Sequence, residues 1–373
     1  MARTLTVFHL NTERTWRGGE GQLLALAEGL QGRGHRNVVV AQKQSELAAR
    51  SLAAGLPTEE VRMRGEWDLA AMHRIGALLK RDRPDVVHMH TSHAHTLGVL
   101  ASKWTGIGRR VVSRRVDFSI HRHVLSLSGF KYGLGVDRYV AISEAVRTQL
   151  VADGIPAAKI TLVHSGVEPH RYLGGDRAKA RASLGVPLEA KLVGTLAHFG
   201  WHKSLETLIA AAEHVVAAVP DAWIAVVGEG ELRGKLEAER AKSAARERVL
   251  LPGFRTDVAD LLAAFDLFVM PSVMEGLCTA ILDAFAVGVP VVASRVGGIP
   301  ELVDHETTGL LVEPKQPKLL ADAIVRALGD EQLRRRMVDA ARASVLDRFT
   351  HDAMVDGTLR VYRELLGEAA DDR

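Results

Sequence analysis

The sequence has a single cysteine, few aromatic residues and no long apolar run, and each shortage excludes a class of protein. With Cys278 alone among 373 residues, the chain cannot form an internal disulfide, which is typical of proteins from a reducing compartment. No apolar run approaches the roughly 18 residues of a membrane-spanning helix, and the first apolar run is too short for a signal peptide. We therefore expect a cytoplasmic protein.

The composition is that of a folded protein with more than one core. Hydrophobic residues make up 47% of the chain and charged residues 25%, which excludes disordered and fibrous proteins. A length of 373 residues suits two domains of roughly 100 to 200 residues each. The net charge of +3 is unevenly distributed. Residues 1–170 contain 23 Lys and Arg against 15 Asp and Glu, whereas residues 171–373 contain 25 Lys and Arg against 30 Asp and Glu. A basic first half indicates either an anionic partner or an ordinary solvated surface.

Short β-branched runs alternate with helical patterns along the whole chain. We expect strands at residues 4–10, 36–42, 84–90, 109–115, 137–143, 159–166, 191–197, 222–228, 249–254, 267–272, 289–294 and 309–314. Two successive βα series predict an α/β protein with two Rossmann-like, doubly wound parallel sheets. Ligands of such sheets bind beyond the carboxyl ends of the strands, so we expect the chemistry there.

A linker near residues 167–188 is indicated by Pro169, Gly174 and Gly175, which interrupt the periodicity. We expect an N-terminal domain of residues 1–170 and a C-terminal domain of residues 171–349. The last helical segment, about 350–373, is expected to pack back on the N-terminal domain.

The stretch MEGLCTAILDAFAVGVPVVAS sets two carboxylates, Glu275 and Asp283, among apolar and small residues. Glu275 is expected in a loop, and Asp283 inside a helix that starts near Cys278 or Thr279 and ends before Gly288. Free N–H groups and a positive dipole at the helix start suit a phosphate, and carboxylates accept hydrogen bonds from vicinal hydroxyls. The alternative is that Glu275 only complements the helix dipole and Asp283 is a solvated surface acid.

This stretch resembles the E-x7-E block of the retaining glycosyltransferases of family 4, the glycosyl transferases group 1. The resemblance is carried by Glu275-Gly276-Leu277, Asp283-Ala284, Gly288–Ser294 and Gly297–Val303. It implies the GT-B architecture, with two Rossmann-like domains facing a cleft, and the transfer of a sugar from a nucleotide-sugar donor. It covers most of the chain and is most specific over residues 190–315.

The resemblance also implies roles for the donor-binding residues. Glu275 would hold a hydroxyl of the transferred sugar, Asp283 the nucleotide ribose and Lys203 the diphosphate. Asp283 replaces the second Glu that is usual in the family and still accepts from a ribose diol. The other residues expected around the donor at the helix start are Gly276, Leu277, Cys278 and Thr279.

One departure from the family pattern concerns the diphosphate. The family commonly has Arg where this sequence has Thr195, so His198, His202 or Arg255 would take its place.

Two glycine pairs follow strands. Gly228 and Gly230 predict a tight turn between a strand and a helix, with its backbone near the nucleotide. Gly18 and Gly19 open a helix after the first strand, and the resemblance makes them a flexible loop between the donor phosphates and the acceptor. The alternative for this second pair is an ordinary turn.

Histidines gather at the end of the third expected strand, in the run HMHTSHAH, which holds His88, His90, His93 and His95. Histidines two apart on a strand share a face, which would suit zinc, but no cysteine or nearby acid completes a familiar spacing. Contact with acceptor or donor, and structural histidines, are the alternatives. We predict no metal site.

A second departure lies after the fourth expected strand. Many family members have T-x-H there, and this sequence has Ser113-Arg114-Arg115 with Asp117 close by. His90, His93, Arg115 and Asp117 are therefore candidate acceptor or active-site residues. A retaining reaction on one face of the sugar can pass the acceptor proton to the leaving phosphate, so the family histidine is not essential.

The same region is basic, with Arg109, Arg110, Arg114, Arg115, Arg122 and Lys131. It suits contact with anionic lipid, with a phosphorylated acceptor, or with solvent alone. Aromatic residues make up only 5% of the chain and no nucleic-acid module is recognisable, so we expect no nucleic-acid partner.

We predict a retaining glycosyltransferase that uses a nucleotide-diphosphate sugar and a hydroxyl acceptor, with a cell-envelope or lipid-linked glycan, as in lipopolysaccharide, favoured by the resemblance. The protein would be cytoplasmic or a peripheral membrane protein at the inner face of the membrane. No D-x-D triplet occurs, so no catalytic divalent metal and no other cofactor is expected. The alternatives are a non-catalytic sugar-nucleotide-binding subunit and a GT-B-like nucleotide-sugar epimerase.

Overall fold

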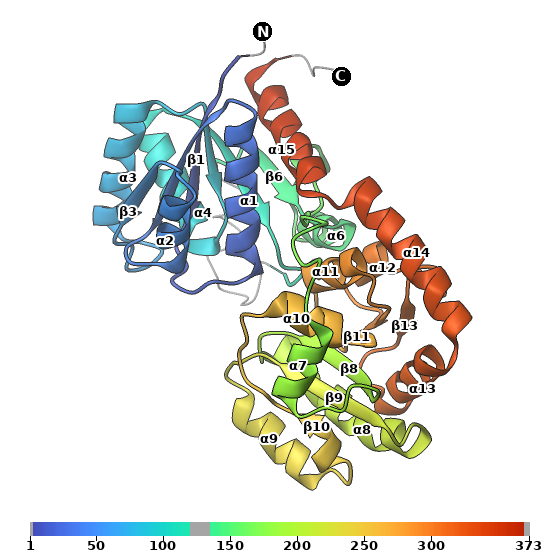
Figure 1. Ribbon diagram of the computed structural model, residues 1–373. Helices are drawn as coiled ribbons and strands as arrows, with labels where there is room; N and C mark the ends of the chain where they lie inside the picture. The colour runs from blue at the N-terminus through green and yellow to red at the C-terminus, as the bar shows by residue number, and fades with distance from the viewer. Residues whose placement is uncertain (1–2, 120–134, 369–373) are drawn as a thin grey trace. The chain divides into compact units, whose positions relative to one another are not determined.

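The computed structural model describes residues 3–119 and 135–368, which form two compact units (Figure 1). Unit 1 comprises residues 1–166 and 351–373, and unit 2 comprises residues 167–350. The chain therefore leaves unit 1 once and returns to it for its last helix.

Unit 1 is built on a parallel sheet of seven strands in the order β3-β2-β1-β4-β5-β6-β7. Its strands are β1 Thr6–Asn11, β2 Arg36–Gln42, β3 Thr58–Val61, β4 Val86–Met89, β5 Arg109–Arg114, β6 Arg138–Ala141 and β7 Ile160–Leu162. Its described helices are α1 Gly18–Gly32, α2 Glu46–Ala53, α3 Leu69–Asp82, α4 Ser92–Thr105, α6 Glu144–Ala152, the short 3-10 helix η1 Ala157–Lys159, and α15 His351–Leu366. This is the doubly wound sheet that the alternating pattern predicts.

Helix α15 lies alongside α1 and closes the core of unit 1 (Figure 1). Its residues Met354, Val355, Leu359 and Tyr362 are buried with residues of α1 and of the sheet. The two helices approach closely at Gly29, where a Cβ atom would lie 2.5 Å from a methyl carbon of Val355. The last helix is thus an integral part of unit 1.

Unit 2 is built on a parallel sheet of six strands in the order β10-β9-β8-β11-β12-β13. Its strands are β8 Lys191–Leu196, β9 Ala222–Val227, β10 Val249–Leu250, β11 Leu267–Met270, β12 Val291–Ser294 and β13 Leu310–Val312. Its helices are α7 Arg177–Leu184, η2 Trp201–Lys203, α8 Leu205–Ala218, α9 Arg233–Lys242, η3 Arg246–Arg248, α10 Val258–Ala264, α11 Thr279–Val287, α12 Ile299–Leu302, α13 Pro317–Gly329 and α14 Glu331–Arg348.

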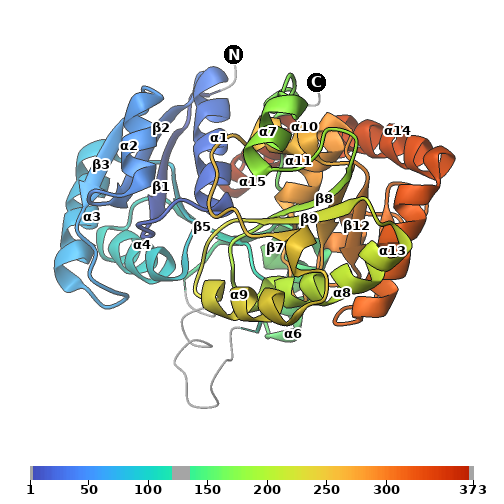
Figure 2. The same ribbon diagram turned by 60° about the horizontal axis from the view of Figure 1, so that its bottom comes forward.

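The two faces of this second sheet carry different helices. Helices α8 and α13 pack together on one face, and α7, α10 and α11 lie on the other (Figure 2). Alternate residues of the strands supply the core under α8 and α13, for example Val193, Ile224 and Val226. Burial on both faces explains why these strands are continuous apolar runs in the sequence.

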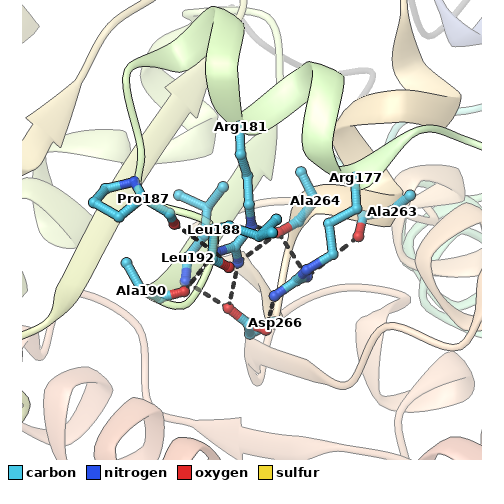
Figure 3. Close-up of polar contacts among 9 residues, drawn as sticks. All are labelled: Arg177, Arg181, Pro187, Leu188, Ala190, Leu192, Ala263, Ala264 and Asp266. Carbon is cyan, nitrogen blue, oxygen red and sulfur yellow. Dashed lines mark hydrogen bonds and ion pairs between the residues drawn. The ribbon is translucent and has the colours of Figure 1, made fainter.

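Helix α7, the first element of unit 2, is held to the sheet by a buried arginine (Figure 3). The Arg181 guanidinium, 1% exposed, donates to the Asp266 carboxylate at 2.7 Å. It also donates to the carbonyl oxygens of Ala264, Pro187, Leu188 and Ala190. Every direction of its donor fork therefore meets an acceptor, which is the condition for burying a charge.

Candidate functional site

The predicted helix after Glu275 is confirmed as α11, which runs from Thr279 to Val287 with Cys278 at its N-cap position. It ends at Gly288, whose φ of +82° is the left-handed conformation that glycine adopts without strain. Burial raises the pKa of the Cys278 thiol to about 12, so this cysteine stays protonated and unreactive at neutral pH. The helix start lies at the carboxyl edge of the sheet, beyond β11.

Glu275 and Lys203 come together at this edge although they are 72 residues apart in the chain. Lys203 Nζ lies 2.5 Å from Glu275 Oε1, and their side chains are only 15% and 9% exposed. Ser272, which the sequence analysis missed, donates a second hydrogen bond to the same carboxylate at 2.7 Å. Burial opposes the charge on Lys203, but the adjacent Glu275 carboxylate outweighs it and raises the pKa of Lys203, so the pair is ionic.

Asp283 lies on α11 and is partly buried beside the linker segment that opens unit 2. Burial raises the pKa of its carboxyl to about 7, against the opposing charge of Arg171. Burial and the Asp283 charge together raise the pKa of Tyr172. The carboxylate accepts no hydrogen bond from any residue that the structure describes, so its acceptor capacity is open to a ligand. The linker residues Arg171 and Tyr172 carried no signal in the sequence.

The glycines of the turn after β9 allow two loops to interlock at the same edge. A Cβ atom on Gly228 would lie 1.8 Å from the carbonyl oxygen of Ala197, and one on Gly230 would lie 2.7 Å from that of Phe199. Both carbonyls belong to the loop that leads from β8 to η2, which ends at Lys203. The predicted tight turn therefore supports the position of Lys203.

Two of the three candidate substitutes for the missing family arginine have other partners. Arg255 forms an ion pair with Asp257 at 2.5 Å and a hydrogen bond with Ser183, so its charge is compensated locally. His198 lies 3.0 Å from the Glu231 carboxylate. The third candidate is His202, and its pKa is lowered, chiefly by burial.

The position of the missing arginine itself is a buried threonine. Thr195 is fully buried, and its hydroxyl has no partner among the described residues. Thr195 thus supplies no charge for the diphosphate, and a donor role for Arg255 remains a prediction.

In unit 1 the core becomes polar toward the carboxyl ends of the central strands. We call this region the polar layer; it contains the buried residues His9, Asn37, His88 and His90. His9 of β1 pairs in register with His88 of β4. Each histidine follows a buried valine by two residues and shares its face of the sheet: Val7 precedes His9, and Val86 precedes His88. His9 Nδ1 lies 3.2 Å from His90 Nε2, and His9 Nε2 lies 3.0 Å from Asn37 Oδ1. His9 is a member of this cluster that the sequence analysis missed, because it lies on a different strand from the histidine run.

His88 is held between two hydroxyl groups. Its Nδ1 lies 2.6 Å from Tyr362 of α15, and its Nε2 lies 2.8 Å from Ser113 of β5. The ligand atoms of His9, His88 and His90 lie within 4.8 Å of one another, so these three residues could hold a metal ion. To do so, His88 would have to give up one of its hydroxyl partners, and burial with the nearby Arg115 charge already disfavours a cation there.

The other two histidines of the run lie apart from this cluster. His93 is exposed in the first turn of α4, and His95 is buried edge-on to Tyr139. The four histidines are therefore not one group, and only His88 and His90 share the polar layer.

Acid should destabilise unit 1 through this layer. Burial lowers the pKa of His9 from 6.5 to about 4 and also holds those of His88 and His90 well below 6.5, so the unfolded chain binds more protons. Stability is complete above pH 6.5 and is lost as the pH falls toward 4, with His9 alone contributing about 3 kcal/mol. Hydrogen exchange between pH 7 and 5 should show loss of protection in β1 and β4.

Unit 2 provides the internal comparison for this experiment. The strands β8 and β11 should lose less protection, and the exposed His214→Gln substitution should leave the pH dependence unchanged. Equal protection of β1 and β4 at both pH values would contradict the prediction.

The glycine pair Gly18 and Gly19 begins α1 directly beyond β1. Glu20 is buried there and accepts hydrogen bonds from Asn11 Nδ2 and from the Arg17 N–H, each at 3.0 Å. Arg115 lies over this helix start, because a Cβ atom on Gly19 would be 3.5 Å from its Cδ. Gly19 and Arg115 therefore meet at the carboxyl edge of the unit 1 sheet, where Asp117 also lies partly buried beyond β5.

The basic region is less free than its sequence suggests. Arg110 makes two hydrogen bonds to Asp137, at 2.9 and 3.0 Å, and Arg114 donates to the carbonyl of Phe118. Arg122 and Lys131 lie outside the described residues. Across residues 3–119 and 135–368, no helix combines the length and the apolar character needed to cross a bilayer.

Two Rossmann-like units, each with polar residues at the carboxyl edge of its sheet, are the architecture expected of a glycosyltransferase of the GT-B type. The family model described as Glycosyl transferases group 1 matches residues 176–344, and the one described as Glycosyltransferase Family 4 matches residues 16–171. The chain belongs to this family, so the predicted family and fold are confirmed.

Curated relatives and solved structures agree with this assignment. D-inositol 3-phosphate glycosyltransferase of Mycobacterium tuberculosis is 30% identical over 87% of this chain and 67% of its own length. N-acetyl-alpha-D-glucosaminyl L-malate synthase of Bacillus anthracis is 27% identical over 80% of each chain. The fold is similar to that of Anabaena HepE in complex with UDP and glucose, with a TM-score of 0.85 and 21% identity over 96% of this chain and 100% of the other.

Proposed function

We propose that this glycosyltransferase moves a sugar from a nucleoside diphosphate donor to a hydroxyl group of an acceptor and keeps the anomeric configuration. The observation that carries the proposal is the buried Lys203–Glu275 pair at the start of α11, with the half-buried Asp283 on the same helix. The Lys203 cation and the helix N-terminus match the diphosphate of such a donor. The Glu275 carboxylate matches its sugar hydroxyls, and the Asp283 carboxylate matches its ribose. The UDP complexes of the similarly folded HepE support a donor of this class.

In the proposed reaction the donor rearranges the ion pair. Lys203 turns from Glu275 to the diphosphate, and Glu275, released from this partner, accepts a hydroxyl of the sugar. Lys203 and the N–H groups of α11 then stabilise the negative charge that grows on the departing diphosphate. The pair in the free protein keeps both charges compensated until the donor binds.

The bond changes balance without a protein base or a metal. The bond between the anomeric carbon and the phosphate oxygen breaks, and a bond to the acceptor oxygen forms on the same face of the sugar. The acceptor proton passes to the departing phosphate oxygen, and the products are a nucleoside diphosphate and the glycosylated acceptor. This chain has Arg115 where many family members have a histidine, and this difference fits a route that needs no protein base.

The acceptor that we propose is a cell-envelope or lipid-linked glycan, at the inner face of the membrane. The family resemblance and the basic character of residues 1–170 support this proposal. Vesicle sedimentation with anionic and neutral lipid would test the membrane contact.

Nucleotide affinity should depend on pH through Asp283. A carboxylate accepts from both ribose hydroxyls, and this carboxyl becomes protonated below its pKa of about 7. We therefore expect affinity to be roughly tenfold weaker at pH 6 than at pH 8. A thermal-shift screen with UDP, GDP, ADP and their sugar conjugates would identify the base, and titration of that nucleotide at both pH values would measure the effect.

Asp283→Asn should weaken nucleotide binding at pH 8 and remove its pH dependence. Asp322→Asn, a change of the same kind in α13 outside the site, should retain both. If no nucleotide stabilises the protein, the proposed function is wrong; if one binds with equal affinity at both pH values, the role of Asp283 is wrong. Donor binding without transfer to any acceptor would instead favour a non-catalytic subunit.

A further inference from the structure

We propose that Arg115 is an anion-binding residue of unit 1 that holds a phosphate or carboxylate group of the acceptor. The inference rests on the proposed function, because it names the chemical class of the acceptor. Arg115 directly follows β5 at the carboxyl edge of the sheet, between the start of α1 and Ser165 beyond β7.

The first argument is that the Arg115 charge has no ion-pair partner among the described residues. Its only hydrogen bond there is a long one, from Nη1 to the hydroxyl of Ser165 at 3.4 Å. Its Nε is buried and has no acceptor. A guanidinium offers five donors in a fixed fork, so most of its capacity is unused.

Other arginines of the same unit show what a structural role looks like. Arg110 is fixed by both oxygens of Asp137, and Arg33 by Asp352 and Asp356 of α15. Arg115 has no such carboxylate, although it is more enclosed than most surface arginines. Packing alone does not explain a partly buried guanidinium whose one hydrogen bond among the described residues is a long one.

The second argument comes from the charges that surround Arg115. Glu20 acts on Arg115 electrostatically, but its carboxylate oxygens accept hydrogen bonds from Asn11 and from the Arg17 N–H and form no ion pair with the guanidinium. Burial keeps the pKa values of His88 and His90 low, so these neighbours are neutral. Burial also lowers the pKa of Arg115 itself, to about 10, which leaves the guanidinium charged at neutral pH.

The third argument is the position over the first turn of α1. The N–H groups of Gly18 and Gly19 belong to the helix start, where backbone donors lack an intrahelical acceptor. The Arg115 side chain packs against this turn, since a Cβ atom on Gly19 would lie 3.5 Å from the Arg115 Cδ. A guanidinium beside a helix start is a combination that suits an anion.

The anion could belong to the acceptor or to the donor diphosphate. We assign it to the acceptor because Arg115 belongs to unit 1, whereas the Lys203–Glu275 pair proposed for the donor belongs to unit 2. Two relatives bear names with small anions, L-malate and D-inositol 3-phosphate, which fits an acceptor of this class.

The experiment is a thermal-shift titration of the full chain and of three variants. The probes are L-malate, inorganic phosphate and inositol 3-phosphate, with uncharged inositol as the control and with the nucleotide that the screen identifies. Arg115→Gln removes the charge, and Arg115→Lys keeps it if the glutamine variant does not fold. Arg109→Gln is the matched control, since Arg109 is exposed at the opposite end of β5.

We expect at least one anion to bind the wild type and Arg109→Gln with similar affinity. Its dissociation constant should be at least roughly tenfold larger in Arg115→Gln. Inositol should not bind, and nucleotide affinity should be equal in all variants. Loss of both anion and nucleotide binding in Arg115→Gln would assign the residue to the donor diphosphate instead.

Two results would overturn the proposal. One is unchanged anion binding in Arg115→Gln, and the other is a wild-type protein that binds the nucleotide but none of the anions. If no nucleotide binds, the proposed function fails, while an anion effect that depends on Arg115 still establishes the anion site.

Discussion

Replacing Glu275 with glutamine should lower the rate of sugar transfer by at least roughly 100-fold while the protein still folds and binds its nucleotide. The variant keeps the shape of the side chain, but the amide is a weaker acceptor for the sugar hydroxyl and carries no charge. It also leaves Lys203, which lies 2.5 Å from the carboxylate, without its counter-charge. The initial rate of nucleoside diphosphate release with donor and acceptor present would measure the effect.

Two further variants separate a role in the reaction from a general loss of stability. Glu189→Gln changes an exposed glutamate just before β8 and should leave the rate unchanged. Ser272→Ala removes one hydrogen bond to Glu275 and should have a much smaller effect than Glu275→Gln. Full activity in Glu275→Gln would show that this carboxylate does not touch the reacting sugar.

Replacing Arg181 with methionine should destabilise unit 2 by about 3 to 5 kcal/mol. The aliphatic part of the side chain would be retained, but the carbonyl oxygens of Ala264, Leu188 and Ala190 would lose a buried donor (Figure 3). Asp266 would keep Arg177 and the Leu192 N–H as partners, so the loss comes mainly from these carbonyls. Urea unfolding, followed by circular dichroism, would give the change in the free energy of unfolding.

A neighbour on the same helix gives the comparison. Lys179 also forms an ion pair, with Asp260, but its side chain is 68% exposed. Lys179→Met should therefore leave the urea midpoint nearly unchanged. Equal midpoints for Arg181→Met and wild type would mean that the buried network adds nothing to stability.

The sequence predicted every long strand, because these strands are buried on both faces and appear as continuous apolar runs. It missed β3, Thr58–Val61, an edge strand in which only Val61 is buried, Glu59 is partly buried and Glu60 is exposed. An edge strand needs no apolar run, so neither periodicity nor hydrophobicity marks it.

The candidate site was predictable where its residues are neighbours in sequence, as around α11. The contact of Lys203 with Glu275 was not, because it depends on how the loops after β8 and β11 meet. His9 gave no signal for a similar reason, since its partners come from β2 and from the residue after β4.

Arg181 is the clearest case of information absent from the sequence. In the segment RAKARASL it is one of several basic residues, and nothing local separates it from a solvated one. Only the position of Asp266, 85 residues later in the chain, makes it a core residue.

The place of α15 also has a consequence for the order of folding during synthesis. The core of unit 1 includes Leu5 from the first strand region and Tyr362 from α15, so it cannot close until residue 362 has left the ribosome. Unit 2 is complete in sequence at residue 350 and does not wait for α15. The nascent N-terminal residues therefore remain without their last packing partner while the later domain assembles, and they depend longest on protection from aggregation.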